Sequence, residues 1–184
     1  PLADVRVPDR VLSDLVLKGA TREQLDRLVI EYRRRRELIE AGVRPRHRLL
    51  FHGPPGTGKT TAAEAIAGEL GLPFAVVRLD ALITSLLGET ASNLRRVMDF
   101  AASNAMVVLF DEFDSIGRDR ADTNEHGELK RVVNALLQMI ESYRGSSLLI
   151  AATNYDQLLD SALWRRFDDT VQFDHPTVAQ IREL

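Results

Sequence analysis

Short apolar runs alternate along the chain with longer segments whose apolar residues recur at helical spacing. Runs that are apolar throughout are typical of strands buried on both faces of a sheet, and helical segments between them serve as crossovers. The predicted strands are residues 49–52, 74–79, 106–110, 148–152 and 170–173, and the predicted helices between them are residues 59–70, 91–102 and 128–141. We therefore expect an α/β fold with three α/β/α layers around a parallel five-stranded sheet.

An amphipathic helix is predicted ahead of this series. Thr21 and Gln24 have the spacing of a capping box, and apolar residues then recur at helical intervals. The helix is expected to run from about residue 21 to residue 41. Residues 1–45 are therefore predicted to form an N-terminal segment and helix that lead into a core of residues 46–184.

The chain has 184 residues, of which 45% are hydrophobic and 28% charged, as expected of one globular domain. Its 24 Lys and Arg residues against 27 Asp and Glu residues give a net charge of −3, so nucleic acid is an unlikely partner. The four consecutive arginines at residues 33–36 point in different directions on a helix and have glutamates within reach. We interpret them as a solvated or subunit-facing surface.

The composition excludes some other classes. The chain has no cysteine, which excludes a disulfide framework and thiolate metal sites and is compatible with a reducing compartment. No apolar run approaches the roughly 18 residues that a membrane helix needs, and the start lacks the apolar stretch of a signal peptide. We therefore predict a cytoplasmic protein without a membrane segment. The chain starts without Met and stops at an apparent helix opening, so we expect a piece of a longer protein.

One glycine-rich segment carries the strongest chemical signal. Residues 53–60, GPPGTGKT, fit the pattern G-x-x-x-x-G-K-[ST] between a predicted strand and a predicted helix, rather than a turn that only connects the two. Its glycines let backbone N–H groups converge on phosphate oxygens at a helix N-terminus. We expect Lys59 to reach the β- and γ-phosphates of a nucleotide and the Thr60 hydroxyl to ligate Mg²⁺. The candidate nucleotide-binding residues are Pro54, Pro55, Gly56, Thr57, Gly58, Lys59, Thr60 and Thr61.

The strand that precedes Asp111 and Glu112 ends in two adjacent carboxylates. The carboxyl ends of strands form the ligand crevice of such a sheet, so both acids are expected at the phosphate site. Asp111 is the expected Mg²⁺ partner, and Glu112 is placed to orient and deprotonate an attacking water. The presence of Glu112 as a second acid favours hydrolysis of a nucleotide over binding of a nucleotide alone. The alternative is that Glu112 caps the following helix or pairs with a base, and for Asp114 a helix cap is the better interpretation.

Residues 148–152 form another apolar strand, which ends in Thr153 and Asn154 and is followed by LDSALWRRFD at residues 159–168. Together with GPPGTGKT and LFDEFDSIG, this series closely resembles the AAA family within the AAA+ ATPases. The match runs from about Val7 to the end of the chain. The resemblance implies the large nucleotide-binding subdomain of a P-loop ATPase, which hydrolyses ATP with Mg²⁺.

The resemblance also implies roles for three polar residues. Asn154 is given the sensor role, in contact with the γ-phosphate and the attacking water, whereas a local alternative is that its amide satisfies nearby backbone groups. Arg165 and Arg166 are given the arginine-finger role, in which they complete the active site of a neighbouring subunit. The alternative is that they pair with Asp168 or Asp169 within their own chain.

Two further parts of the family pattern are weaker here. Leu15 and Val16 lie in the segment that takes the place of the one beside adenine in the family. Leu86 and Leu87 stand where threading relatives carry an aromatic and an aliphatic residue that grip a peptide in the pore. Leucine lacks the flat amphipathic face of an aromatic, and these leucines could equally be core residues of a short helix, so threading stays open.

The resemblance implies a homo-oligomeric ring, by family habit a hexamer, that remodels or unfolds protein clients. Two alternatives stay open: a nucleotide-gated assembly switch with little turnover, and a DNA-acting motor or loader, which the missing basic stripe disfavours. The family's small helical lid would begin where the chain stops, so the lid is expected to be absent. Without it we expect weakened nucleotide affinity and poor oligomerisation.

Overall fold

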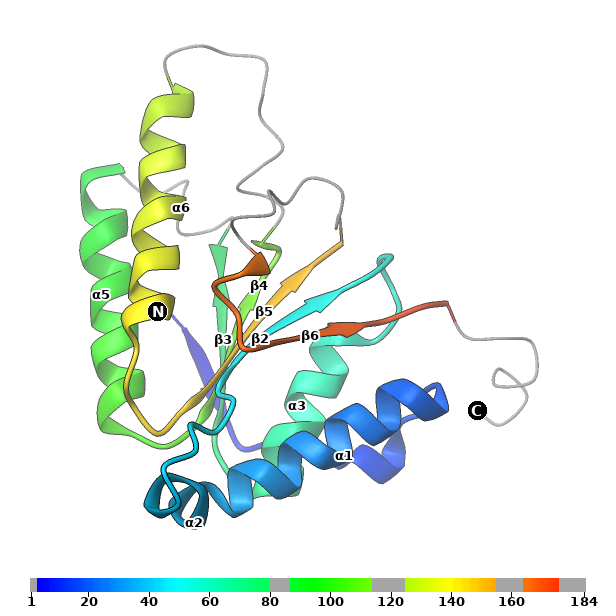
Figure 1. Ribbon diagram of the computed structural model, residues 1–184. Coiled ribbons are helices and arrows are strands. Elements are labelled where there is room, and N and C mark those ends of the chain that lie inside the picture. The colour runs from blue at the N-terminus through cyan, green and yellow to red at the C-terminus, as the bar shows by residue number, and fades with distance from the viewer. Residues whose placement is uncertain (1–2, 80–86, 114–124, 155–163, 176–184) are drawn as a thin grey trace.

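The apolar segments form a twisted sheet with helices packed on both of its faces (Figure 1). The computed structural model describes residues 3–79, 87–113, 125–154 and 164–175. The strands are β1 (Asp4–Arg6), β2 (Arg48–His52), β3 (Phe74–Arg78), β4 (Val107–Asp111), β5 (Leu148–Thr153) and β6 (Asp169–Gln172). The helices are η1 (Leu12–Asp14), α1 (Gly19–Arg33), α2 (Arg35–Glu40), α3 (Lys59–Leu70), α5 (Leu87–Ser103) and α6 (Glu125–Ser142). Across these residues, none of the helices has the length and apolar character needed to span a membrane.

The strand order in the sheet is β1-β3-β4-β5-β2-β6. All neighbouring strands are parallel except β1, which runs antiparallel to β3. Because β2, β4 and β5 are parallel neighbours, their carboxyl ends meet at one edge of the sheet, which we call the carboxyl edge. Their starts, with α2 nearby, lie at the opposite or amino edge (Figure 1). The predicted three-layer α/β/α fold is confirmed.

The prediction of five parallel strands was one strand short. The additional strand, β1, has three exposed residues and carries no apolar pattern that would predict it. Its pairing is supported instead by Arg6, whose Nη2 donates to Glu64 Oε2 at 3.0 Å and whose guanidinium lies 5.5 Å from the Phe74 ring centroid. Such a strand depends on its neighbours, so only the folded chain reveals it.

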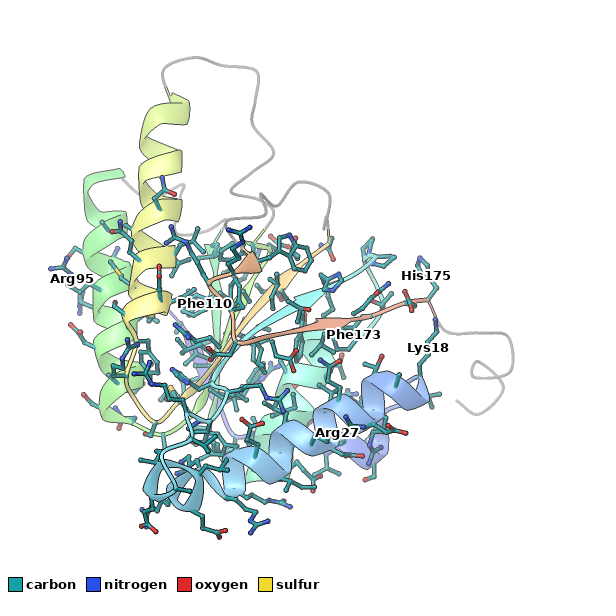
Figure 2. The ribbon with its side chains drawn as sticks, in the orientation of Figure 1. Lys18, Arg27, Arg95, Phe110, Phe173 and His175 are labelled. Carbon is teal, nitrogen blue, oxygen red and sulfur yellow. The ribbon has the colours of Figure 1, made fainter. Side chains whose placement is uncertain are left out.

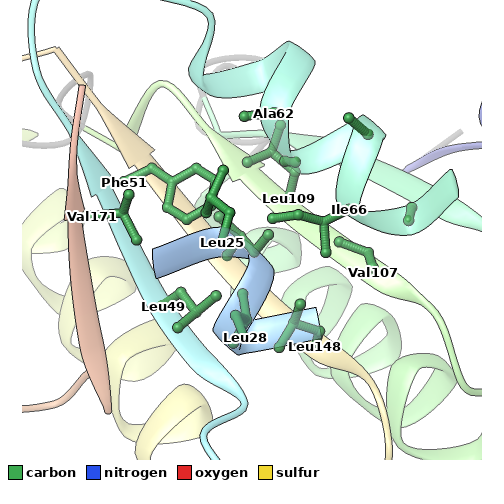
Figure 3. Packing of buried hydrophobic residues seen from close by; sticks show 14 of the residues in the cluster. Leu25, Leu28, Leu49, Phe51, Ala62, Ile66, Val107, Leu109, Leu148 and Val171 are labelled. Carbon is green, nitrogen blue, oxygen red and sulfur yellow. The ribbon is translucent and has the colours of Figure 1, made fainter. Parts of the chain in front are cut away.

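Two apolar layers sandwich the central strands because successive strand residues point to opposite faces. In β2, Leu49 and Phe51 face α1 and α3, whereas Leu50 faces α5 and α6. Figure 3 shows Leu25 and Leu28 of α1 and Ile66 of α3 gathered over the first of these faces. Burial of a leucine or phenylalanine side chain contributes about 1.5–3 kcal/mol, so both layers hold the three central strands in register.

The N-terminal helix differs from its prediction in two ways. It begins at Gly19, before the expected capping box, and it is interrupted at Arg34, so that α1 and α2 replace one helix of residues 21–41. The Thr21 hydroxyl donates to Gln172 O at 3.1 Å and Gln24 Nε2 donates to Thr170 O at 2.8 Å. These side chains therefore dock α1 on the backbone of β6 and do not cap the helix.

The other predicted helices are confirmed. The segment 59–70 coincides with α3, while residues 91–102 and 128–141 lie within α5 and α6, which are longer. Apart from Leu87, the extra residues are glycine or polar and add no apolar periodicity. Sequence periodicity therefore located the helix centres better than their ends.

Gly53, the residue after β2, is held tightly against the end of β6. Its φ of 140° belongs almost only to glycine, and a Cβ built on it would lie 1.9 Å from Phe173 O. The rings of Phe51 and Phe173 lie alongside, with centroids 5.0 Å apart. The exit of β2 into the glycine-rich loop is thus fixed by the neighbouring strand.

Asp168 fastens the start of β6 to the start of β2. Its carboxylate accepts hydrogen bonds from the backbone N–H groups of His47 at 3.1 Å and Arg48 at 3.0 Å, and it also pairs with the Arg48 guanidinium. Burial alone would raise the pKa of Asp168, but the Arg48 guanidinium and the two N–H donors outweigh it and lower the pKa. The ionised carboxylate therefore stabilises this junction.

Gly53→Ala is expected to destabilise the chain by about 2–5 kcal/mol, because alanine meets both backbone strain and a clash with Phe173 O. Gly42→Ala is the matched control, since Gly42 also has a positive φ of 77° but no atom within 4 Å of an added Cβ. The control should lose only about 1–2 kcal/mol. The free energy of unfolding in urea measures both. Equal losses of stability in the two variants would show that the contact of Gly53 with the end of β6 does not affect stability.

Asp168→Asn is expected to lower the free energy of unfolding at pH 7 by about 1–3 kcal/mol. The folded-state pKa of Asp168 is below its ordinary value, so its contribution is complete above the unfolded pKa of about 3.9 and is lost as pH falls through the folded value. The difference between the two proteins should therefore shrink below about pH 4. Asp9→Asn is the control, because Asp9 is exposed on the surface, 3.8 Å from Arg10. A difference that is the same at pH 3 and pH 7 would contradict the ionic interpretation.

Candidate functional site

The glycine-rich loop connects β2 to α3 at the carboxyl edge of the sheet. Gly56 and Gly58 have φ angles of 76° and 90°, conformations that side chains other than glycine rarely adopt. The Thr57 hydroxyl donates to Pro54 O at 2.8 Å and closes the loop on itself. Gly58 is also the residue that caps the N-terminus of α3, so the loop and the backbone N–H groups of the first helical turn are adjacent. This arrangement suits a bound anion.

Lys59, the first residue of α3, is almost fully buried, with 7% of its surface exposed. Its Nζ donates to Gly53 O at 2.7 Å and to Pro54 O at 2.8 Å, so the ammonium lies inside the loop. A buried ammonium needs acceptors, and loop carbonyls supply them here. Phosphate oxygens could take their place, which is the chemistry predicted for this lysine.

The structure joins the loop to the end of β4 through one hydrogen bond. The Thr60 hydroxyl donates to Asp111 Oδ2 at 3.0 Å, although the residues are 51 positions apart. A hydroxyl and a carboxylate oxygen at this separation suit Mg²⁺, which takes few protein ligands and completes its shell with phosphate and water. In the described segments no three His, Cys, Asp or Glu side chains are grouped to hold a metal by themselves. The donor set therefore fits a metal bound together with a nucleotide.

Glu112 follows Asp111 in a strained backbone conformation. Within the described residues, Glu112 is the residue other than glycine that has a positive φ, at 56°. Its side chain is exposed. Its backbone N–H donates to Asp111 Oδ1 at 2.9 Å, which holds the turn at the end of β4. Such strain costs about 1–3 kcal/mol and gathers at functional sites. The proposed helix cap by Asp114 lies outside the described residues.

Asn154 follows β5, the strand between β2 and β4 in the sheet. Thr153 pairs in register with His52, so Asn154 comes level with the start of the glycine-rich loop. The side chain is partly exposed. The fold therefore brings Asn154 to the same edge as Lys59 and Asp111, as predicted. Thr61 also lies there, half-buried in the first turn of α3.

The two arginines before β6 differ in their surroundings. Arg165 is exposed, whereas Arg166 is partly buried and its Nη1 lies 3.2 Å from Glu141 Oε2. That nitrogen makes no hydrogen bond in the described structure, so the contact is an ion pair without hydrogen-bond geometry. The alternative that both arginines pair with Asp168 or Asp169 is wrong within the described residues. Arg48 and Arg46 pair with those two aspartates instead.

Residues 164–168, which carry Arg165 and Arg166 and which we call the arginine segment, meet the carboxyl edge through Trp164. Its ring packs edge-on against His52, the last residue of β2, with ring centroids 4.8 Å apart. Neither residue was predicted to be functional, because a lone aromatic and a lone histidine carry no motif. Their contact fixes one end of the segment that bears Arg165.

The segment with Leu15 and Val16 lies between η1 and α1 and is partly buried. Lys18, which follows it, donates to Asp174 Oδ2 at 2.7 Å beyond the end of β6, and Figure 2 shows Lys18 beside this end of the strand. The Lys18 ammonium lowers the pKa of Asp174. Because Phe173 contacts Gly53, this segment lies close to the glycine-rich loop, where the base of a nucleotide was predicted. The pair of Lys18 and Asp174 was not predicted.

Some predicted residues are not tested by this geometry. Leu86 lies outside the described residues, and the described part of Leu87 is limited to its place at the start of α5. Their part in peptide threading stays a prediction.

Comparison with known proteins gives a consistent family assignment. The sequence model of the ATPase family associated with various cellular activities (AAA) matches residues 49–175. An uncharacterized AAA family ATPase, y4kL, of Sinorhizobium fredii is 49% identical over 95% of this chain and 53% of its own length. The ATP-dependent zinc metalloprotease FtsH 3 of Sphaerobacter thermophilus is 34% identical over 96% of this chain and 37% of its own. The peroxisomal ATPase pex6 of Schizosaccharomyces pombe is 40% identical over 73% of this chain and 15% of its own.

A solved structure supports the same fold. The crystal structure of the FIGL-1 AAA domain superposes with a TM-score of 0.81 over 99% of this chain and 60% of that chain, at 22% identity. This likeness concerns the fold alone. The chain spans about half the length of the y4kL relative and a smaller share of the other two. Since the family model covers more than half of the chain and y4kL is similar along nearly all of it, this protein belongs to the AAA family of ATPases.

Proposed function

We propose that this chain hydrolyses ATP with Mg²⁺ at the carboxyl edge of the sheet. The observation that carries the proposal is the 3.0 Å hydrogen bond between the Thr60 hydroxyl and Asp111, which unites the glycine-rich loop with the acidic end of β4. The loop N–H groups and Lys59 would bind the phosphates, and Thr60 and Asp111 would hold the metal. When bound, Mg²⁺ neutralises charge on the phosphate oxygens.

Glu112 is proposed as the general base. It follows the metal-binding candidate Asp111 directly, and its exposed side chain is free to meet a water at the phosphate site. Asn154, at the end of the neighbouring strand, would orient the same water and contact the γ-phosphate. Leu15 and Val16 are proposed to lie beside the base.

Arg165 is proposed as the residue that completes the site of a neighbouring subunit. Its exposure supports this role, because a group that reaches across an interface must be accessible in the single chain. Arg166 is partly buried and lies against Glu141, so we assign it to holding the segment in place. A positive group from a second chain would stabilise charge that develops in the transition state.

Assembly and client are proposed from the resemblance and from the relatives. The relatives include a metalloprotease named as ATP-dependent and a putative regulatory subunit homolog of the 26S proteasome from Methanothermobacter marburgensis, both named for protein degradation. We propose that the complete protein forms a ring, by family habit a hexamer, and remodels a protein client. A cytoplasmic location is part of the same proposal.

ATP hydrolysis per chain should rise with protein concentration and fall in two variants. Glu112→Gln is expected to lose about 10²–10⁴-fold in rate as a general base. Arg165→Ala is expected to lose about 10³–10⁵-fold as a group supplied across the interface. Arg166→Ala is the matched control and should lose far less. Phosphate release at saturating ATP measures all four proteins.

Mixing variants tests whether the arginine acts on a neighbour. An equal mixture of Glu112→Gln and Arg165→Ala chains should recover about a quarter of the wild-type rate, since random head-to-tail neighbours restore that share of sites. A mixture of Glu112→Gln and Lys59→Ala should stay inactive, because both residues act within one chain. No recovery in the first mixture would exclude Arg165 as a group supplied in trans. ATP binding without turnover at any concentration would favour the nucleotide-gated switch.

A further inference from the structure

A cavity lies at the amino edge of the sheet, away from the glycine-rich loop. Its volume is about 510 Å³, and its walls come from the end of α1, from α2, from the segment that enters β2 and from the turn after α6. In Figure 1 these parts lie at the end of the sheet opposite the tips of β2 and β5. Cavities of about 300–1,000 Å³ are the size of small-molecule sites. The nucleotide chemistry makes no use of this one.

Positive charge is concentrated around this cavity. Residues 33–48 contain seven of the chain's 24 Lys and Arg residues but two of its 27 Asp and Glu residues, on a chain whose net charge is −3. Some of this charge is compensated: Arg46 pairs with Glu31 and Asp169, and Arg48 pairs with Asp168. The remaining arginines decide what the cavity can bind.

Three arginines that line the cavity have no carboxylate partner within the described residues: Arg35, Arg44 and Arg144. Arg35 is positioned by the Tyr32 ring, whose centroid lies 4.2 Å from the guanidinium carbon, and it donates to Tyr32 O at 3.0 Å. Arg144 Nη1 donates to Glu141 O at 3.0 Å and to Tyr143 O at 2.8 Å. These contacts orient two of the guanidinium groups without neutralising them.

The chemistry of this set favours phosphate. Guanidinium groups match phosphate oxygens in a fork geometry, and a phosphate offers three acceptors to cations that arrive from three segments. A nucleic acid would need a basic stripe, whereas these arginines surround one cavity on a chain of net negative charge. Exposed Ile39 adds an apolar wall. We propose that this cavity binds a small phosphate-bearing molecule, separately from the nucleotide at the carboxyl edge.

The cavity is connected to the arginine segment before β6 by contacts through Glu141. The Glu141 carbonyl accepts hydrogen bonds from Arg48 at 2.9 Å and Arg144 at 3.0 Å, both of which line the cavity. The Glu141 carboxylate lies against Arg166. A ligand that draws Arg144 toward its phosphate would therefore act on the residue that holds this segment.

Pyrophosphate is the probe, titrated into the ¹⁵N-labelled chain and followed by amide chemical shifts. Amides of residues 42–44, 46–48 and 144–146 should shift and saturate with one Kd. Arg44→Gln combined with Arg144→Gln should weaken that Kd by about tenfold or more, because two charge-assisted contacts are lost.

Amides of residues 56–61 report pyrophosphate binding at the glycine-rich loop separately, and Lys59→Ala should change only the response of these amides. An absence of shifts at residues 56–61 would therefore contradict the proposed ATP site and not the proposed site at the amino edge.

Arg36→Gln combined with Arg95→Gln is the matched control, because both side chains are exposed and neither lines the cavity. This pair removes the same charge and should leave the Kd unchanged. The proposal would be overturned by an absence of saturable shifts at the cavity amides, or by equal weakening in the control pair. Tighter binding of a glutamate-rich peptide at the same amides would overturn it in favour of an acidic protein partner. Lysine at positions 44 and 144 should keep part of the affinity, since it retains charge but loses the fork.

Discussion

Burial of the central strands on both faces is the constraint on which the rest of the structure depends. The side chains of β2, β4 and β5 that face the helices are almost entirely removed from water, alternately toward α1 and α3 and toward α5 and α6. A strand in this position has no solvated face on which to place polar groups. Polar chemistry is therefore confined to the strand ends, where the chain leaves the apolar layers.

At the carboxyl edge this confinement produces the candidate active site. Three strands that are separate in the sequence end side by side, and their ends bring Gly53, Asp111 and Asn154 to one edge. The hydrogen bond from Thr60 to Asp111 is the direct result of that convergence. Packing thus determines which polar residues meet, and the glycines determine how closely a phosphate can approach.

At the amino edge the same confinement collects an excess of positive charge. The basic stretch that enters β2 meets the turn after α6 and the start of β6, and two of its arginines are neutralised by glutamate or aspartate from those elements and from α1. Others keep their charge around a cavity. The two edges therefore have different electrostatic character, although one central strand, β2, connects them.

The sequence by itself determined the features that local patterns encode. Apolar runs located the five strands of the parallel part of the sheet, periodicity located the helix centres, and GPPGTGKT with the pair Asp111 and Glu112 located the candidate site. These features could be predicted because each depends on residues close together in the chain. The family resemblance added Asn154 and the two arginines, which no local rule would have selected.

Only the tertiary structure decided which distant residues are partners. Arg48 pairs with Asp168, 120 positions away, and Thr21 binds a carbonyl of β6 although its spacing predicts a helix cap. The pairing of the edge strand β1 with β3 and the contact of Arg166 with Glu141 also join residues that are distant in the sequence. A polar side chain near several candidates takes the partner that packing brings within reach, because leaving a partly buried charge or backbone carbonyl unpaired costs more than breaking a local preference.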